Sequence, residues 1–144
     1  MRILLDTSVL VAAMVEAHPA HEQGLAWLKR VSDGTDKGLV AAHSLAELYA
    51  VLTTLPVRPP ISPLDAQRLI KHNIIERLEI VSLSERDYTQ VITHLAALGI
   101  VGGATYDALI LHAAAKAKVD LVVTFNEKDF QRVYPNLADK IVTP

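Results

Sequence analysis

Short apolar runs alternate with helical patterns along most of this 144-residue chain, and that alternation constrains the fold more than any other feature. Strands are expected over residues 2–6, 39–42, 78–83 and 121–125, with an edge strand at 140–143. Alternating strands and helices favour a parallel sheet that is covered by helices on both faces. We therefore predict an α/β fold, namely a three-layer α/β/α sandwich around a central, mostly parallel sheet.

Cap and turn residues divide the helical part of the chain. A helix pair split near His18-Pro19 is expected after the first strand. Its second member covers 20–31, and later helices are expected over 44–55, 63–75, 85–98, 105–118 and 127–133. Ser62 and Ser84 stand where two of these helices need N-caps. No repeat or linker divides the chain, so we predict one domain over residues 1–144.

The composition excludes several classes of protein. Hydrophobic residues make up 51% of the chain, yet no stretch approaches the roughly 20 apolar residues of a membrane span. Cysteine is absent, which rules out disulfides and thiolate metal sites and suits a reducing compartment. The formal net charge of −2 lacks the basic footprint of a protein that coats duplex nucleic acid. We expect a cytoplasmic protein without membrane attachment, whose contacts with nucleic acid are local.

Three carboxylates and one amide lie on the carboxyl side of apolar runs. Asp6, Glu47 and Asn126 each come after an expected strand, and Asp107 lies near the start of a helix. The carboxyl ends of parallel strands meet at one crevice, where α/β proteins bind their ligands. Acids gathered there repel one another, and a divalent cation with oxygen ligands is the simplest means of holding them together. The pattern therefore predicts a metal-dependent site.

Each acid also has a purely structural explanation. Asp6 could cap the helix that follows the first strand. The segment Ser44-Leu45-Ala46-Glu47 fits a capping box, in which the glutamate reaches back to the N–H of the cap residue. Asp107 stands in a first helical turn, where the helix dipole favours an acid.

The helix around Asp107 helps to separate these explanations. At about 100° per residue, Asp107 shares a face with apolar residues, and polar residues occupy the far side. The apolar face carries Ile110, Leu111 and Ala114, and the far side carries His112 and Lys116. A capping acid does not need to face the core, and four independent caps at one sheet edge would be a coincidence. We therefore favour a shared site.

Four short segments carry a further signal. They are Leu4-Leu5-Asp6-Thr7-Ser8-Val9-Leu10, Ala46-Glu47-Leu48-Tyr49-Ala50-Val51-Leu52-Thr53, Tyr106-Asp107-Ala108-Leu109-Ile110 and Thr124-Phe125-Asn126-Glu127-Lys128-Asp129-Phe130. In order and local sequence they resemble the PIN domain, and more closely its VapC-type toxin branch. The resemblance covers almost the whole chain, and the ordered set at these spacings is specific.

The resemblance implies a magnesium-dependent ribonuclease that cleaves single-stranded RNA, with Asp6, Glu47 and Asp107 as its acids. It also implies the toxin of a type II toxin–antitoxin pair, with a cognate antitoxin as partner and a homodimeric assembly. At the family's fourth site position, which is often acidic, this chain has Asn126, an uncharged and weaker ligand. Asp129 could compensate for the missing acid or serve as the helix-end partner of Asn126, and we favour the second role.

The residue types suggest separate roles within that site. Asp6, on a strand end, and Asp107, on an inward helix face, are predicted direct ligands of Mg²⁺, for which Mn²⁺ could substitute. The longer Glu47 is predicted to bind through water or to orient the attacking water. Hydroxyl groups at the same edge could hold water or phosphate, or serve only in turns. These are Thr7, Ser8 and Thr124.

Other side chains have weaker support as functional groups. His18 and His21 have a spacing that a metal could use, but they are expected to be solvated. The basic residues that could meet RNA phosphate are expected to face solvent. They are Arg58, Lys116, Lys118, Lys128 and Arg132. The aromatic residues interpreted as core or interface rather than base-stacking surfaces are Trp27, Tyr49 and Tyr106.

A dimer face is predicted where two helices carry more apolar residues than one sheet face needs. These residues are Ile74, Ile75, Leu95 and Leu98. An isologous contact between two copies would cover them.

Three other functions are alternatives to a nuclease. A haloacid-dehalogenase-type phosphatase needs a second aspartate two residues after the first, where this chain has Ser8. A response-regulator receiver needs an acidic pair after the first strand and a lysine after the fifth, and neither is evident. The remaining alternative is a non-catalytic PIN-like module that binds RNA or a protein partner, which the amide at Asn126 keeps open.

Overall fold

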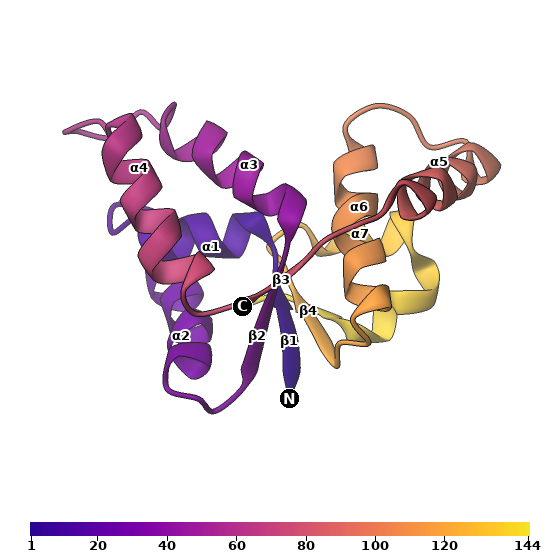
Figure 1. Ribbon diagram of the computed structural model, residues 1–144, viewed down its shortest axis with the longest axis horizontal. Coiled ribbons are helices and arrows are strands. Elements are labelled where there is room, and N and C mark those ends of the chain that lie inside the picture. Colours follow the sequence, from indigo (N-terminus) through magenta and orange to yellow (C-terminus); the bar gives the residue numbers. More distant parts are fainter.

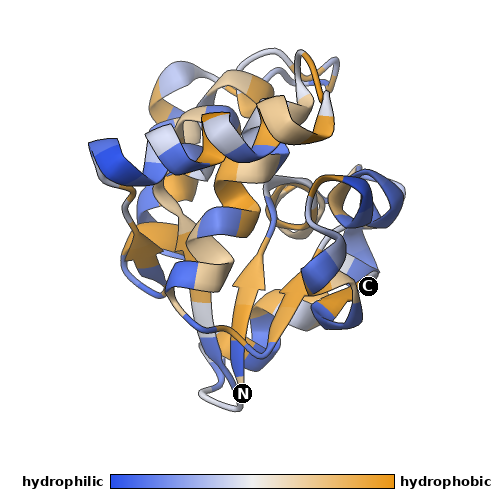
Figure 2. Ribbon diagram, turned by 90° about the vertical axis from the view of Figure 1, so that its right-hand side faces the viewer, coloured by the Kyte–Doolittle hydropathy of each residue, from blue (hydrophilic) through white to orange (hydrophobic).

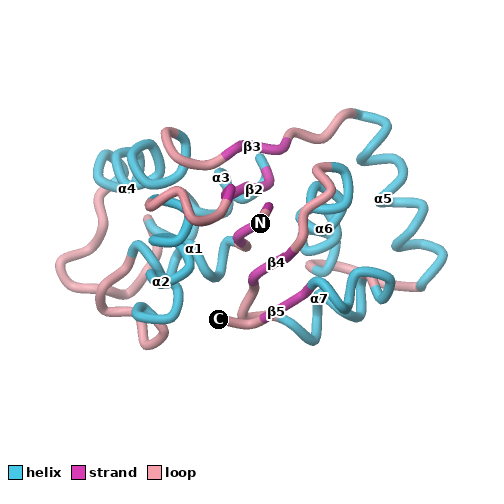
Figure 3. Tube along the Cα trace, turned by 90° about the horizontal axis from the view of Figure 1, so that it is seen from below, coloured by secondary structure: helices cyan, strands magenta, loops and turns pink.

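The sheet at the centre of the molecule contains five strands, all parallel, in the order β3-β2-β1-β4-β5. This computed structural model describes all 144 residues. The strands are β1 (Arg2–Leu5), β2 (Lys37–Ala41), β3 (Glu79–Val81), β4 (Leu121–Val123) and β5 (Ile141–Val142). Figure 3 shows them side by side in this order between two groups of helices. Every predicted strand is present, and the predicted α/β/α sandwich is confirmed.

Two groups of helices cover the two faces of the sheet (Figure 1). One face carries α1 (Thr7–Met14), α2 (His21–Ser32), α3 (Ala42–Leu52), α4 (Pro63–Ile70) and a π-helical turn, η1 (Lys71–Ile75). The other face carries α5 (Glu85–Leu98), α6 (Ala104–Lys116), α7 (Glu127–Val133) and a 3₁₀ segment, η2 (Pro135–Lys140). No helix combines the length and hydrophobicity that a membrane span requires.

The two faces of the sheet bury separate hydrophobic cores because successive strand residues point in opposite directions. Along β1, Ile3 and Leu5 pack with the α1–α4 side, whereas Leu4 packs with the α5–α7 side. All three are fully buried. A strand segment buried on both faces needs apolar residues at successive positions, which explains the continuous apolar runs and the largely hydrophobic strands in Figure 2. Only the first residues of β1, β2 and β3 are charged.

The caps at the helix ends agree with the sequence in two places and disagree in one. Ser62 accepts a hydrogen bond from the Asp65 N–H, and Ser84 forms a reciprocal capping box with Asp87. The capping box that offered a structural explanation for Glu47 does not form. The chain passes directly from β2 into α3, so α3 begins at Ala42 and Ser44 lies inside it, fully buried and without a hydrogen-bond partner.

The predicted dimer face is wrong in part. Ile74 and Leu95 belong to the two hydrophobic cores, at 0% and 5% exposure. Ile75 and Leu98 are exposed, but η1 and α5 cover opposite faces of the sheet, as Figures 1 and 3 show. The four residues therefore do not form one continuous surface.

Candidate active site

Asp6 occupies the turn between β1 and α1, at the carboxyl edge of the sheet. Its backbone N–H donates to the Val123 carbonyl of β4 at 3.0 Å, which fixes the turn beside the neighbouring strand. The carboxylate atom Oδ2 accepts hydrogen bonds from Ser8 Oγ at 2.7 Å and Thr124 Oγ1 at 2.8 Å. Although Asp6 is at the N-cap position of α1, its side chain makes no capping hydrogen bond.

The environment of Asp6 makes its negative charge unfavourable. The residue is only 3% exposed, and burial raises its pKa above the ordinary value. The hydroxyls of Ser8 and Thr124, and to a lesser extent the nearby backbone amides of Thr7 and Ser8, act in the opposite direction without cancelling that rise. A buried carboxylate held by neutral hydrogen-bond donors alone has its geometry fixed and its charge uncompensated.

Glu47 reaches the same region from α3. Its Oε1 accepts a long hydrogen bond from Thr7 Oγ1 at 3.4 Å and lies 3.3 Å from His43 Nε2, although this second contact lacks hydrogen-bond geometry. Partial burial raises the pKa of Glu47, the negative charge of Asp6 raises it further, and the Thr7 hydroxyl lowers it. The two carboxylates are therefore close enough to repel each other.

Asp107 approaches from the opposite face of the sheet, in the first turn of α6. Partial burial raises the pKa of Asp107 to about 6, and the charges of Asp6, Asp129 and Glu47 add to the effect, while Arg132 offsets part of it. The helix face below Asp107 is buried as predicted, through Ile110, Leu111 and Ala114.

Asn126 stands at the N-cap of α7, but its side chain makes no capping hydrogen bond. Its backbone N–H donates to Thr124 Oγ1 at 2.9 Å, so the hydroxyl that donates to Asp6 also fixes the loop that carries Asn126. Asp129 is not the helix-end partner that we expected for Asn126. Its charge instead acts on Asp107.

A cleft of about 420 Å³ collects all four predicted site residues. Its lining consists of Asp6, Thr7, Ser8, Val11, His18, Ala20, Glu47, Val51, Leu55, Asp107, Phe125 and Asn126. No lysine or arginine is among these residues, so nothing in the lining with a permanent positive charge balances the three acids. The same three acids have raised pKa values, and perturbed acids in a cleft are typical of functional sites.

The donor set of this cleft fits a hydrated Mg²⁺ ion. The side chains offer carboxylate, amide and hydroxyl oxygens, which hard cations prefer. No three Asp, Glu, His or Cys side chains are grouped closely enough to hold a metal ion between them. Mg²⁺ usually keeps several waters and binds through one or two carboxylates, for which Asp6 and Asp107 are available. A cation there would also relieve the repulsion that raises the pKa values of these acids.

The structure adds three residues that the sequence did not place near the site. His18 lines the cleft, and its ring is fixed by a hydrogen bond from the Ala20 N–H to Nδ1 at 3.0 Å. His43 and Tyr106 stack on each other beside Glu47. The spacing of His43 four residues before Glu47 was the available signal, since such residues share a helix face.

The expected core placement of Tyr106 is wrong, because the residue is 52% exposed. Its alternative placement at an interface stays a prediction. Lys116 is exposed, as expected, and its Nζ binds Asp87 at 2.7 Å and the Ser82 carbonyl at 3.2 Å.

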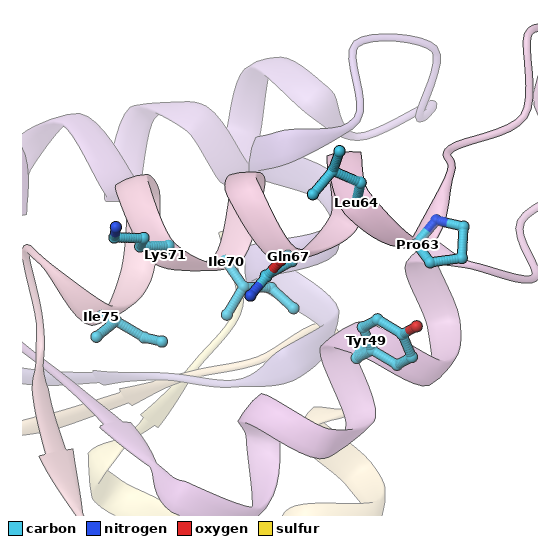
Figure 4. A pocket seen from close by; sticks show the side chains of 7 residues that line it. All are labelled: Tyr49, Pro63, Leu64, Gln67, Ile70, Lys71 and Ile75. Atoms are coloured by element: carbon cyan, nitrogen blue, oxygen red, sulfur yellow. The ribbon is translucent and has the colours of Figure 1, made fainter.

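A larger hollow of about 560 Å³ lies between α3 and α4, away from the acids. Its lining residues are Tyr49, Pro63, Leu64, Gln67, Ile70, Lys71 and Ile75. Figure 4 shows Tyr49 on α3 facing the side chains of α4 and η1. The lining is mainly apolar and contains no acid, so it lacks the groups that the chemistry of the acid cleft requires.

Comparisons with known proteins assign the family. The PIN domain model matches residues 3–135. Ribonuclease VapC27 of Mycobacterium tuberculosis is 35% identical over 119 residues, which is 83% of this chain and 81% of the relative. Ribonuclease VapC40 of the same species is 35% identical over 117 residues, 81% of each chain. The chain belongs to the PIN domain family.

Solved structures with the same fold agree. VapBC2 from Rickettsia felis, bound to a promoter DNA fragment, has a TM-score of 0.69 at 24% identity and covers 100% of this chain and 99% of its own. VapC20 of Mycobacterium tuberculosis, a toxin that cleaves the sarcin-ricin loop, has a TM-score of 0.68 at 15% identity. The match covers 88% of this chain and 92% of VapC20. FitAB bound to a DNA fragment has a TM-score of 0.64 at 20% identity. The match covers 99% of this chain and 94% of the matched chain.

Proposed function

We propose that this protein is a Mg²⁺-dependent endoribonuclease that cleaves single-stranded RNA, and that it is the toxin of a type II toxin–antitoxin pair. The observation that carries the proposal is the group of three mutually repelling carboxylates in one cleft, at the carboxyl edge of a parallel sheet. Two relatives at 35% identity that are named ribonucleases support the same reaction.

Each side chain has a role that follows from its position. Asp6 and Asp107 would hold the cation, Asp6 from a strand end fixed by two hydroxyl groups and Asp107 from the facing helix. When bound, Mg²⁺ supplies the positive charge that activates water and stabilises the charge developing on the phosphate. Glu47, half-buried and with a raised pKa, orients the attacking water and is suited to accept its proton. Asn126 adds a neutral oxygen ligand or a donor for a phosphate oxygen.

The reaction proposed is direct hydrolysis by water, without a covalent intermediate. Water attacks the phosphorus atom in line with the bond to the 3′-oxygen while Glu47 accepts a proton from the water. The bond to the 3′-oxygen breaks, and the departing oxygen takes a proton from solvent. The products are a 5′-phosphate and a 3′-hydroxyl. Mapping the two ends of a cleaved RNA is therefore an independent check of the mechanism.

Variants at the two proposed ligands test the nuclease. Asp6→Asn or Asp107→Asn should reduce Mg²⁺-dependent cleavage of single-stranded RNA by at least about a hundredfold, on the order of 3 kcal/mol in the barrier. Asp33→Asn, at an exposed position beyond α2, is the matched control and should keep the parent rate. Undiminished cleavage by either ligand variant would reject the assignment.

A non-catalytic module that binds RNA or a protein partner is the second candidate. The amide at Asn126, in place of the family's frequent fourth acid, is the feature that favours it. The two functions separate cleanly, because a binding module would retain RNA or partner affinity while the parent protein shows no metal-dependent cleavage. If the protein is the nuclease, Mn²⁺ should support RNA cleavage in place of Mg²⁺.

We also propose an antitoxin partner and self-association to a homodimer. Two of the similar solved structures are VapBC2 and FitAB assemblies on DNA, which supports a toxin–antitoxin context. A small reading frame directly upstream that encodes a DNA-binding protein would be the genomic counterpart. Light scattering at tens of micromolar protein tests the dimer, and a monomeric mass would reject it.

A further inference from the structure

Two aromatic rings form a rigid stack at the border of the acid cleft. The imidazole of His43 on α3 and the phenol ring of Tyr106 on α6 have centroids 5.0 Å apart and an interplanar angle of 1°. Tyr106 directly precedes Asp107, and His43 lies one helical turn before Glu47, so the stack is tied to two of the three acids. Tyr106 remains 52% exposed, which leaves a large part of its ring open to solvent.

A hollow of about 390 Å³ adjoins this stack and shares lining residues with the acid cleft. Its lining residues are His43, Ala46, Glu47, Ala50, Val51 and Tyr106. Glu47 and Val51 line both this hollow and the acid cleft, so the two are neighbours across one side of α3. The alanines at positions 46 and 50 present only methyl groups, which leaves room for a flat ligand beside the tyrosine ring.

We infer that Tyr106, backed by His43, is the stacking surface for the unpaired RNA base next to the scissile phosphate. This inference rests on the proposed nuclease function and adds a substrate-binding subsite to it. A phosphate placed at Asp6 and Asp107 has its neighbouring nucleotide within reach of the adjoining hollow. Proteins that bind single strands use aromatic side chains in this way, because every base offers a π-face.

The His43–Tyr106 stack is suited to this role because the platform is formed before RNA arrives. Burial lowers the pKa of His43, which favours the uncharged imidazole in the stack. A side chain already held in its binding orientation loses little conformational freedom when the ligand docks.

The test compares four variants in Mg²⁺-dependent cleavage and in binding of a fluorescein-labelled, mixed-sequence single-stranded RNA. Tyr106→Ala should weaken RNA binding and raise KM about fivefold to a hundredfold, with kcat at saturating RNA within about twofold of the parent. Tyr106→Phe keeps the ring and should behave as the parent does. Tyr106→Leu fills the space and packs on His43 without a π-face, so it should behave as the alanine variant does.

Tyr88→Ala is the matched control, since Tyr88 is a tyrosine of similar exposure on α5 and lines none of these hollows. It should bind and cleave RNA as the parent does. Unchanged KM and RNA affinity in Tyr106→Ala would overturn the inference, as would Tyr106→Leu retaining parental RNA affinity, because packing alone would then explain the residue. A loss of kcat alone in Tyr106→Ala, with unchanged KM, would also overturn it.

The binding measurement keeps this inference separate from the nuclease proposal. A parent that binds RNA but does not cleave it rejects the nuclease, while the loss of binding in Tyr106→Ala still supports the stacking surface. A parent that cleaves RNA with Tyr106→Ala at parental KM rejects the stacking surface and leaves the nuclease standing. Thermal melts confirm that each variant is folded before either assay.

Discussion

Acids at the two ends of the central sheet are in opposite electrostatic environments. At the amino end, buried Asp36 accepts hydrogen bonds from the N-terminal ammonium at 2.9 Å and from Arg30 Nε at 2.6 Å. These contacts hold the pKa of Asp36 below its ordinary value. At the carboxyl end, Asp6 and Asp107 have no such partner in the cleft lining, and their pKa values are raised.

The same contrast extends along the amino edge. Glu79, at the start of β3, binds Lys37 at 2.6 Å and lies 3.7 Å from Arg2, and its pKa is lowered. Paired acids of this kind contribute to stability, whereas unpaired acids in a cleft destabilise the metal-free protein and remain available to a ligand. The difference indicates which end of the sheet serves function and which serves stability.

The largest expected effect is the contrast in activity and stability between Asp107→Asn, at the carboxyl end of the sheet, and Asp36→Asn, at the amino end. Asp107→Asn should abolish cleavage, by at least about a hundredfold, and should raise the thermal midpoint in chelator because it removes repulsion. Asp36→Asn should leave cleavage intact and lower the free energy of unfolding by about 1–3 kcal/mol, because the N-terminal ammonium and Arg30 lose a charged acceptor. Denaturant melts and initial cleavage rates measure both. If both variants are destabilised and active, the acids at both ends are structural.

The stabilisation that Mg²⁺ gives should also differ between the two variants, by a slightly smaller free energy. At a hundredfold excess over its dissociation constant, Mg²⁺ should stabilise the parent by about 2.7 kcal/mol, because it binds only the folded state. The Asp36→Asn variant should show the same shift, and Asp107→Asn should show little. Melts with Mg²⁺ and with chelator measure this, and an absent shift in the parent would remove the basis for a metal site.

The alternation of apolar runs with helical patterns made the fold predictable from the sequence, whereas contacts between distant helices were not predictable. The inward face of Asp107 could be predicted because it is a property of one helix. The sequence around Glu47 fits a capping box, and only the direct turn from β2 into α3 shows that the box does not form. The His43–Tyr106 stack joins α3 to α6 across 63 residues of chain (106 − 43), so no local pattern encodes it. Ile74 and Leu95 looked like surplus apolar residues because sequence alone does not show how much core a helix covers.

The pH dependence of stability should also differ between the ends. The folded-state pKa of Asp107 is about 6, above its ordinary value of 3.8. Its destabilising effect is therefore full above pH 6 and is relieved as the pH falls toward 3.8, because the folded state takes up the proton first. The lowered pKa values of Asp36 and Glu79 act the other way, and their stabilisation is lost only when the pH falls below the ordinary carboxyl range.

The parent and Asp107→Asn should therefore differ in stability when a chelator is present. The variant should be more stable by about 1–2 kcal/mol near pH 7.5, after allowance for solvent screening of a partly exposed acid, and the gap should shrink toward pH 5. Groups remote from Asp107 cancel in the difference, whereas the acids whose charges repel Asp107, namely Asp6, Glu47 and Asp129, contribute to the same pH dependence. A gap that is constant with pH would show that Asp107 does not titrate in this range.

The smallest effect concerns the hydroxyl that holds Asp6. Ser8 Oγ donates to Asp6 Oδ2 at 2.7 Å and accepts the Phe125 N–H at 3.2 Å, so Ser8→Ala should cost about 1 kcal/mol of stability. It also removes a donor that lowers the pKa of Asp6, so less of the acid is ionised at a given pH and the acidic limb of the pH–rate profile should move to higher pH. Ser62→Ala removes the α4 cap at a similar cost of about 1 kcal/mol, away from the cleft, and should leave the profile in place. Equal profiles in the two variants would mean that Ser8 supports the fold and not the charge of Asp6.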